Sequence, residues 1–468
     1  MCRKKGQAIS QISAALLLIA FIIIIFFIFY SPTSEPELNL ASGKLPLFVF
    51  SLIFSLVVLI ITFVNTDMAL IILIFSMLLS PEFKLAEVPA REVVVRMDDI
   101  LLGVVFFGWL AKMALNKDLG LLRRTSLTSL ILGYIAVCII STIVGIVNAY
   151  IIPLTSFFYV LKYIQYFMLY FLVTNNIRDQ KQVKTFIIAL LLTCVIVCIY
   201  TLPQIGVLSR TTAPFEGKAG EANTLAGYLV LLFAVSIGIF LYSRSRTWKI
   251  FTGIVCFFII PSFIFTLSRS SYLAFIVMYS VIILVSRSKR LFLIAGALLV
   301  VCIVFVFLPQ VVDTITGRIA STFTPYKTYH AFGKNLPLEQ SAVARVEGWR
   351  TVFRYWLKSP ILGYGVTGVG LVDIQYPRVL GETGIIGFVI FIWLLILIFR
   401  NSLAIFKGVK NSWAKGLSLG FLAGFTGLLV QGFGANTFII VRIMEPFWFL
   451  AAIVMMLPYL EEFEVVDV

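Results

Sequence analysis

The chain has 468 residues, of which 60% are hydrophobic and only 13% are charged, and its mean hydropathy is +1.04. This composition excludes an ordinary soluble globular protein, in which about 25% of residues are charged. The formal net charge is +15, but no segment resembles a base-reading helix, so we expect no nucleic-acid partner.

The apolar residues fall into runs of about 18–22, long enough to cross a hydrocarbon layer of about 30 Å as helices. We expect the first span to be retained, because no small-residue cleavage site follows it. The fourteen candidate spans, of which 67–80 is the shortest, are 11–30, 45–63, 67–80, 98–116, 127–147, 155–173, 184–204, 223–242, 249–266, 270–286, 291–309, 384–400, 416–434 and 440–459. The predicted fold class is an all-α polytopic membrane protein of about 12–14 transmembrane helices, with residues 1–468 as a single membrane domain.

Basic residues predict the orientation of these spans. If the N-terminus is cytoplasmic, the cytoplasmic segments contain 20 Lys and Arg, whereas the short outer loops contain about eight. This asymmetry follows the positive-inside rule. It places both termini in the cytoplasm and explains the net positive charge.

Residues 310–383 then form one large extracytoplasmic loop between two spans. A structureless loop of this length is uncommon and usually functional. Within it, "SAVARVEGWRTVFRYWLKSP" predicts an amphipathic helix, whose apolar face carries Val346, Trp349, Phe353, Trp356 and Leu357. Such a helix could lie on the membrane surface or cover an outward-facing site as a lid, and both interpretations stay open.

The stretch "SPILGYGVTGVG" contains the spacing GxGxxG at Gly363, Gly365 and Gly368. A dinucleotide fingerprint needs a preceding strand within a βαβ unit. Here the glycines follow a predicted helix and a proline, which argues against nucleotide binding. We expect a glycine hinge in which positive φ angles allow a close approach of backbone segments.

Metal and disulfide sites are not expected. Five of the six cysteines lie inside predicted spans, and the large loop contains none. The sequence shows no cluster of histidines or carboxylates with the spacing of metal ligands. We therefore predict no metal, no cofactor and no disulfide framework.

Four motifs follow one another between about residues 200 and 400. The first, "RTTAPFEGKAGEANTLAGYL", contains Arg210, and the second, "TLSRSSYLAF", contains Arg269. The third, "RVEGWRTVFRYWLKSPILGYGVTGVG", begins near Arg345. The fourth, "DIQYPRVLGETGIIGF", carries Asp373, Tyr376, Arg378, Glu382, Gly384 and Gly387. In this order the motifs resemble the signature of the O-antigen ligase and polymerase superfamily.

The resemblance implies a membrane glycosyltransferase with a GT-C-like architecture. Its donor would be a glycan linked to a polyprenyl diphosphate, used at the outer face of a bacterial plasma (inner) membrane. Negative charge grows on the diphosphate as the glycosidic bond breaks, and guanidinium groups suit this task. Arg210 and Arg269 are the candidates, because the predicted topology independently places both at the outer ends of spans.

Further residues are candidates for substrate binding. Lys162 lies inside a span near its outer end, where a charge is expensive unless it is functional or snorkels to the surface. The motifs add Arg345, Tyr376, Arg378 and Glu382.

A base must accept the proton of the acceptor hydroxyl. The ligase motif has a His-Asn pair eleven residues before Gly384, where this chain has Asp373 and Ile374. A carboxylate is chemically adequate as this base, so we predict Asp373. Glu382 and His330, the only histidine, remain alternatives.

The predicted enzyme is a metal-independent inverting glycosyltransferase, either a polymerase of repeat units or a ligase. The departure from the His-Asn pair slightly favours the polymerase. The predicted partners are the lipid-linked donor, a glycan or lipid acceptor and membrane lipids, while the need for a chain-length regulator stays open. A transporter or flippase of lipid-linked oligosaccharide is the alternative of another class, although no repeated halves are evident.

Overall fold

The computed structural model describes residues 45–80, 82–88, 91–115, 123–215, 220–307, 309–321, 327–331, 334–370 and 372–466. The predicted span 11–30 lies outside these residues. Each of the other thirteen predicted spans coincides with a helix, which confirms the all-α polytopic fold. These helices are α2 (Leu45–Val64), α3 (Thr66–Leu79), α4 (Met97–Leu115), α5 (Thr128–Val147), α6 (Pro153–Asn176), α7 (Gln180–Thr201), α8 (Ala222–Tyr242), α9 (Arg246–Ile264), α10 (Arg269–Val285), α11 (Arg290–Phe307), α14 (Gln375–Gly408), α15 (Ser412–Gln431) and α16 (Val441–Val466).

Not every one of these helices can cross a membrane alone. Among the described residues, eight helices are long and apolar enough: α5, α6, α7, α8, α9, α14, α15 and α16. The pair α10 and α11 would add a ninth span, broken by a bend of 102°. Helix α3 has 14 residues and so spans only about 21 Å. Because most of its side chains are buried, its apolar character reflects protein packing rather than contact with lipid.

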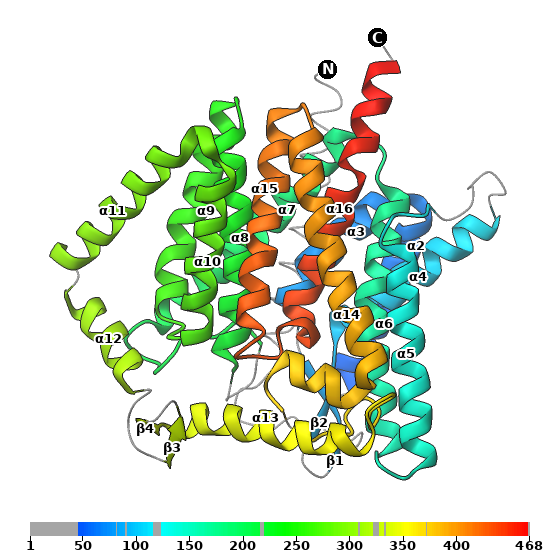
Figure 1. Cartoon of the computed structure of the whole chain (residues 1–468). Helices are drawn as coiled ribbons and strands as arrows, with labels where there is room; N and C mark the ends of the chain where they lie inside the picture. Colours follow the sequence, from blue (N-terminus) through cyan, green and yellow to red (C-terminus); the bar gives the residue numbers. More distant parts are fainter. Residues whose placement is uncertain are drawn as a thin grey trace.

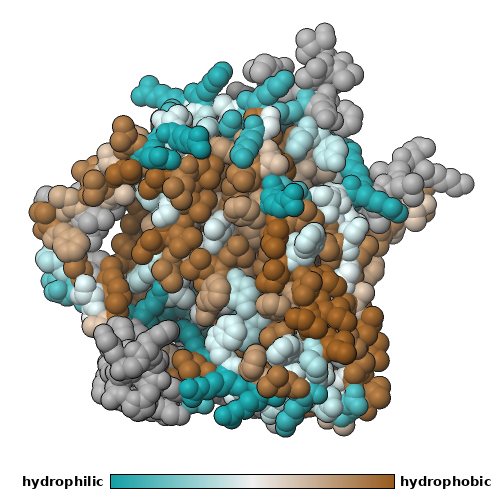
Figure 2. Space-filling view, in the orientation of Figure 1, coloured by the Kyte–Doolittle hydropathy of each residue, from teal (hydrophilic) through white to brown (hydrophobic). Residues whose placement is uncertain are grey.

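The remaining elements gather at one end of the bundle (Figure 1). They are the hairpin of β1 (Glu82–Val88) and β2 (Arg91–Arg96), helix α12 (Pro309–Ala320), the hairpin of β3 (Lys327–Ala331) and β4 (Lys334–Leu338), and helix α13 (Gln340–Lys358). Helix α13 runs across this end, whereas α16 finishes at the opposite end (Figure 1). In Figure 2, hydrophilic residues line both ends, and a broad hydrophobic belt lies between them.

Helices α8 and α16 form the centre of the bundle, because 89% of the residues in the apolar stretch of each helix are buried. Helix α15 packs against α8 through small residues. A Cβ atom on Gly238 would lie 2.3 Å from the carbonyl oxygen of Gly416 and 2.7 Å from the nitrogen of Gly420, so only glycine fits there. This close contact fixes the beginning of α15 against the end of α8.

At the other ends of these two helices, polar contacts join the end of α15 to the beginning of α8. Gln431, at the end of α15, donates to the carbonyl oxygen of Asn223 at 2.8 Å and to Ser271 Oγ at 2.9 Å. Ser268 Oγ donates to Asn223 Oδ1 at 2.8 Å. These hydrogen bonds hold together the beginnings of α8 and α10, within the motifs that carry Arg210 and Arg269.

Candidate active site

A cavity of about 820 Å³ opens at the end of the bundle that carries α13. Its wall combines the beginnings of α8 and α16, part of α6 and α13, and the loops before α14 and α16. The wall is rich in cationic side chains, which come from six parts of the chain: Arg96, Lys162, Arg210, Arg345, Arg378 and Arg442. Two carboxylates, Glu221 and Asp373, also line it. Such a cavity can hold a polar, anionic substrate.

Arg210 lines the cavity from the segment between α7 and α8. Its Nε donates to the carbonyl oxygen of Thr266 at 2.8 Å and its Nη2 donates to Asn223 Oδ1 at 3.2 Å. Burial lowers the pKa of Arg210, and the nearby charges of Arg318 and Arg345 lower it further. These hydrogen bonds fix the guanidinium through neutral oxygens and leave its positive charge available to an anion.

Arg269 begins α10, at the tight turn after α9. Its guanidinium pairs with Glu339 and donates to Ser341 Oγ at 2.7 Å, both at the beginning of α13. It lies within electrostatic range of Arg210, Arg318 and Arg345. Arg269 thus joins the same group of arginines and also ties α13 to the bundle, although it does not itself line the cavity.

Arg345 lines the cavity from α13, and its Nε donates to the carbonyl oxygen of Gly434 at 3.1 Å. Burial lowers the pKa of Arg345, while the carboxylate of Asp373 opposes this shift. Arg318, on α12, also acts on Arg345 and completes the arginine group. Sequence reasoning missed Arg318 because α12 shows no motif, and only its position relative to α13 reveals the role. We call Arg210, Arg269, Arg318 and Arg345 the arginine group.

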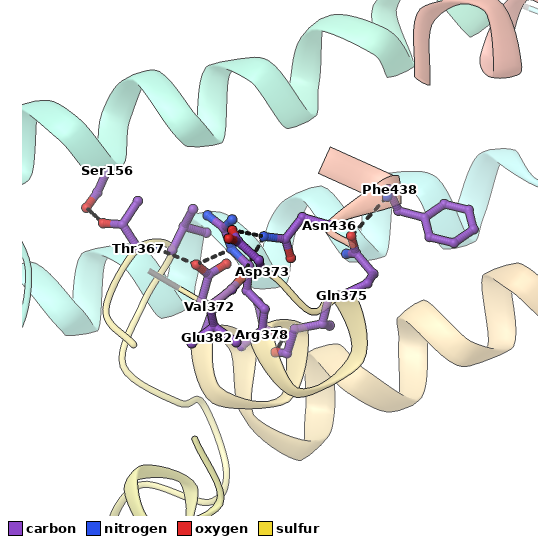
Figure 3. A network of polar contacts seen from close by, with 12 residues as sticks. Ser156, Thr367, Val372, Asp373, Gln375, Arg378, Glu382, Asn436 and Phe438 are labelled. Atoms are coloured by element: carbon purple, nitrogen blue, oxygen red, sulfur yellow. Dashed lines mark hydrogen bonds and ion pairs between the residues drawn. The ribbon is translucent and has the colours of Figure 1, made fainter. Parts of the chain in front are cut away.

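Asp373 exposes its side chain to the cavity, directly before α14. Asn436, from the loop before α16, donates through Nδ2 to the carbonyl oxygen of Val372 at 2.6 Å and to Asp373 Oδ1 at 3.4 Å (Figure 3). Asp373 therefore has a defined position, faces the cavity and lies close to Arg345. No feature of the sequence singled out Asn436, because an asparagine in a short loop is unremarkable until the loop is placed.

Glu382 has a different environment. It is buried, and its Oε1 lies 2.9 Å from Arg378 Nε and accepts a 2.9 Å hydrogen bond from the backbone nitrogen of Thr367 (Figure 3). Arg378 lines the cavity, whereas Glu382 does not. Tyr376 is also buried, donates to the carbonyl oxygen of Leu429 at 2.6 Å and packs against Phe433. These contacts indicate that Glu382 and Tyr376 hold the cavity wall in place.

The glycine-rich stretch adopts the expected backbone. Gly363 and Gly365 have φ of 68° and 87°. Tyr364 and Gly365 donate from their backbone nitrogens to the carbonyl oxygens of Gly381 and Glu382, at 3.0 and 2.9 Å. The stretch is therefore tied to the segment that carries Arg378 and Glu382, which fixes that segment at the edge of the cavity.

Lys162 lines the cavity from α6, one turn from Tyr159. Arg96 lies nearby in the same wall, and its Nη2 is 3.0 Å from Asp98 Oδ2 and 3.9 Å from Asp99 Oδ1. His330 lies in β3 opposite Asn335, and its side chain is outside the described residues. It stays an untested alternative base.

Asp98, Asp99 and Glu445 form a carboxylate cluster, in which Asp98 and Glu445 are buried and Asp99 is half-buried. The sequence did not reveal it, because α4 and α16 lie far apart in the chain. Their ligand atoms lie within 4.8 Å of one another, a geometry that could hold a metal ion. The guanidinium of Arg96 already contributes a positive charge there, and Gln165 donates to Asp99 and Glu445 at 2.6 and 3.2 Å. The cluster thus holds the Arg96 guanidinium in position. That the reaction needs no metal ion stays a prediction.

Comparison with protein families bears on this arrangement. The family model described as O-antigen ligase matches residues 254–392, from α9 to α14, and confirms the resemblance to the O-antigen ligase and polymerase superfamily. The chain is thus similar to multi-pass membrane glycosyltransferases that use a lipid-linked glycan donor and a glycan acceptor. The match includes Arg269, Arg318, Arg345 and Asp373 but not Arg210. None of the curated proteins matches the chain.

Proposed function

We propose that the protein transfers a glycan from a polyprenyl diphosphate to the hydroxyl of an acceptor glycan at the outer face of the bacterial plasma membrane. The observation that carries this proposal is the cavity whose wall holds the exposed carboxylate of Asp373 together with Arg210 and Arg345 of the arginine group. The family match to residues 254–392 supports the same class of reaction.

In the proposed reaction, the arginine group binds the diphosphate of the donor. The acceptor oxygen attacks the anomeric carbon, and the bond from that carbon to the diphosphate oxygen breaks with its electron pair. Asp373 accepts the proton of the acceptor hydroxyl as the hydroxyl becomes acidic. Attack opposite the leaving group inverts the anomeric configuration. The arginines act where charge develops, which favours the transition state over the bound donor.

The direct test uses purified full-length protein and a synthetic polyprenyl-diphosphate glycan. We expect released polyprenyl diphosphate and longer glycan chains, with unchanged rates in the presence of a chelator. No product with any glycan or lipid acceptor would contradict the proposal. Loss of product on chelation would contradict only its metal independence.

Within this proposal we favour a polymerase over a ligase, on the basis of Asp373 at the position of the His-Asn pair of ligases. A polymerase should extend a lipid-linked repeat unit, whereas a ligase needs a different acceptor. A chain-length regulator as partner is tested by adding candidate regulators and measuring the distribution of product lengths.

A further inference from the structure

The cationic residues of the cavity fall into two sets with different charge balance. Within the arginine group, Arg210 and Arg345 line the cavity and are held by neutral oxygens, whereas Arg269, which does not line it, pairs with Glu339. On the part of the wall formed by β2, α6 and α14, guanidinium groups are instead matched by buried carboxylates. Arg96 pairs with Asp98, and Arg378 pairs with Glu382.

Arg378 illustrates this second environment. It is 3% exposed, its Nε lies 2.9 Å from Glu382 Oε1, and its guanidinium carbon lies 5.6 Å from the centre of the Tyr159 ring. Its Nη2 is buried at the cavity wall with no hydrogen-bond partner among the described residues. A buried donor without a partner is costly, so a ligand oxygen at this position would satisfy it.

The charge balance decides what kind of ligand fits. A carboxylate beside a guanidinium neutralises much of the attraction for a further anion, but it leaves the other N–H groups as fixed hydrogen-bond donors. Fixed donors beside an aromatic ring suit a hydroxyl-rich, neutral ligand. Arg210 and Arg345, which are held by neutral oxygens, suit the diphosphate instead.

We propose that the wall formed by Arg96, Tyr159, Lys162 and Arg378 is the subsite for the sugar of the acceptor, distinct from the diphosphate subsite at the arginine group. This inference rests on the proposed glycosyl transfer and adds the place at which the acceptor sugar binds. Asp373 lies in the same cavity, near Arg345 and five residues before Arg378. In this proposal the acceptor hydroxyl meets the anomeric carbon beside Asp373, where the two subsites adjoin.

The test measures the two subsites separately in purified full-length protein. Farnesyl diphosphate probes the diphosphate subsite. The repeat-unit oligosaccharide released by mild acid from the host cell's own polysaccharide probes the sugar subsite. Binding of each probe is measured by saturation-transfer NMR titration with Arg378→Lys, Tyr159→Leu and Arg210→Gln. The Lys variant retains a positive charge beside Glu382, so that it can fold.

We expect Arg378→Lys and Tyr159→Leu to bind the oligosaccharide about ten-fold more weakly and to bind farnesyl diphosphate within about two-fold of the wild type. Arg210→Gln should show the reverse pattern, with about ten-fold weaker binding of farnesyl diphosphate. If Arg378→Lys and Tyr159→Leu weaken only farnesyl diphosphate, the sugar subsite is overturned and this wall binds anions.

The wild type separates this inference from the proposed function. Binding of farnesyl diphosphate without binding of the oligosaccharide would overturn the sugar subsite and leave the proposed transfer standing. Binding of neither probe would overturn both.

Discussion

At the residue scale, the site depends on the partners that hold each charged side chain. Arg210 and Arg345 are fixed through neutral oxygens of Thr266, Asn223 and Gly434, so their charge remains for a ligand. Arg378 and Glu382 instead form a buried ion pair. The same residue type therefore serves two purposes, and only the contacts distinguish them.

Asp373 provides the most direct test of the proposed base. Asp373→Asn preserves the shape of the side chain but cannot accept a proton, so we expect the turnover rate to fall about 10²–10⁴-fold while donor affinity stays similar. Initial rates and donor binding with the synthetic polyprenyl-diphosphate glycan measure both quantities.

Asp313→Asn is the matched control, because Asp313 is an exposed carboxylate of α12 that does not line the cavity. It should retain the wild-type rate. Full activity of Asp373→Asn would remove Asp373 as the base and direct attention to His330.

At the element scale, the two faces of α13 are compatible with both interpretations that its sequence left open. Trp349, Phe353 and Leu357 are exposed at 41%, 51% and 62%, as a helix in contact with lipid headgroups would require. Ser341 and Arg345 of the same helix line the cavity, and Val352 packs in a small cluster with Val369, Val372 and Ile374. The helix therefore covers the cavity with one face and presents aromatic residues on another.

Helix α14 is interrupted where the motif has its second group of glycines. Gly384 adopts φ of 64° and ψ of −166°, a region that only glycine occupies readily. The short helical segment before it carries Arg378 and Glu382, and the membrane span follows it. The nitrogen of Ile385 donates to the carbonyl oxygen of Pro360 at 2.9 Å, and Ser141 donates to that of Glu382 at 2.6 Å.

Gly384→Ala should destabilise this junction strongly. A Cβ atom there would lie 2.2 Å from the carbonyl oxygen of Ile361, and the backbone strain adds to this clash. We expect the free energy of unfolding to fall by more than about 2 kcal/mol. The midpoint of thermal unfolding in detergent measures the effect.

Gly133→Ala is the control for this substitution. Gly133 lies within α5, and a Cβ atom there would meet nothing within 4 Å. Its substitution should change stability by no more than about 1 kcal/mol. Equal stability of the Gly384→Ala variant and the wild-type protein would mean that the junction is not as closely packed as described.

At the scale of the whole molecule, the cavity and α13 lie at one end of a hydrophobic belt (Figures 1 and 2). The distribution of Lys and Arg predicts that this end faces away from the cytoplasm. In that orientation we expect the arginine group to lie at the level of the lipid headgroups, where a polyprenyl diphosphate carries its charge. The proposed reaction therefore depends on this topology.

Two exposed loop residues test the orientation. Asn148 follows α5 on the predicted outer side, and Arg244 precedes α9 on the predicted cytoplasmic side. In a background with Cys2 and Cys302 replaced by Ser, a membrane-impermeant maleimide should label Asn148→Cys in intact cells. It should label Arg244→Cys only after the cells are permeabilised, and labelling in the opposite order would invert the topology.

The sequence by itself determined the membrane class, most helix positions and the predicted orientation, because apolar runs and flanking basic residues are local properties of the chain. Its motifs also identified Arg210, Arg269, Arg345 and Asp373 as candidate site residues. Only the tertiary structure joined Arg318 to the arginine group, placed Asn436 beside Asp373 and paired Arg378 with Glu382. It also separated α3 from the helices that can span a membrane. The physical reason is that burial and charge pairing arise between segments distant in the sequence, so no local pattern of residues encodes them.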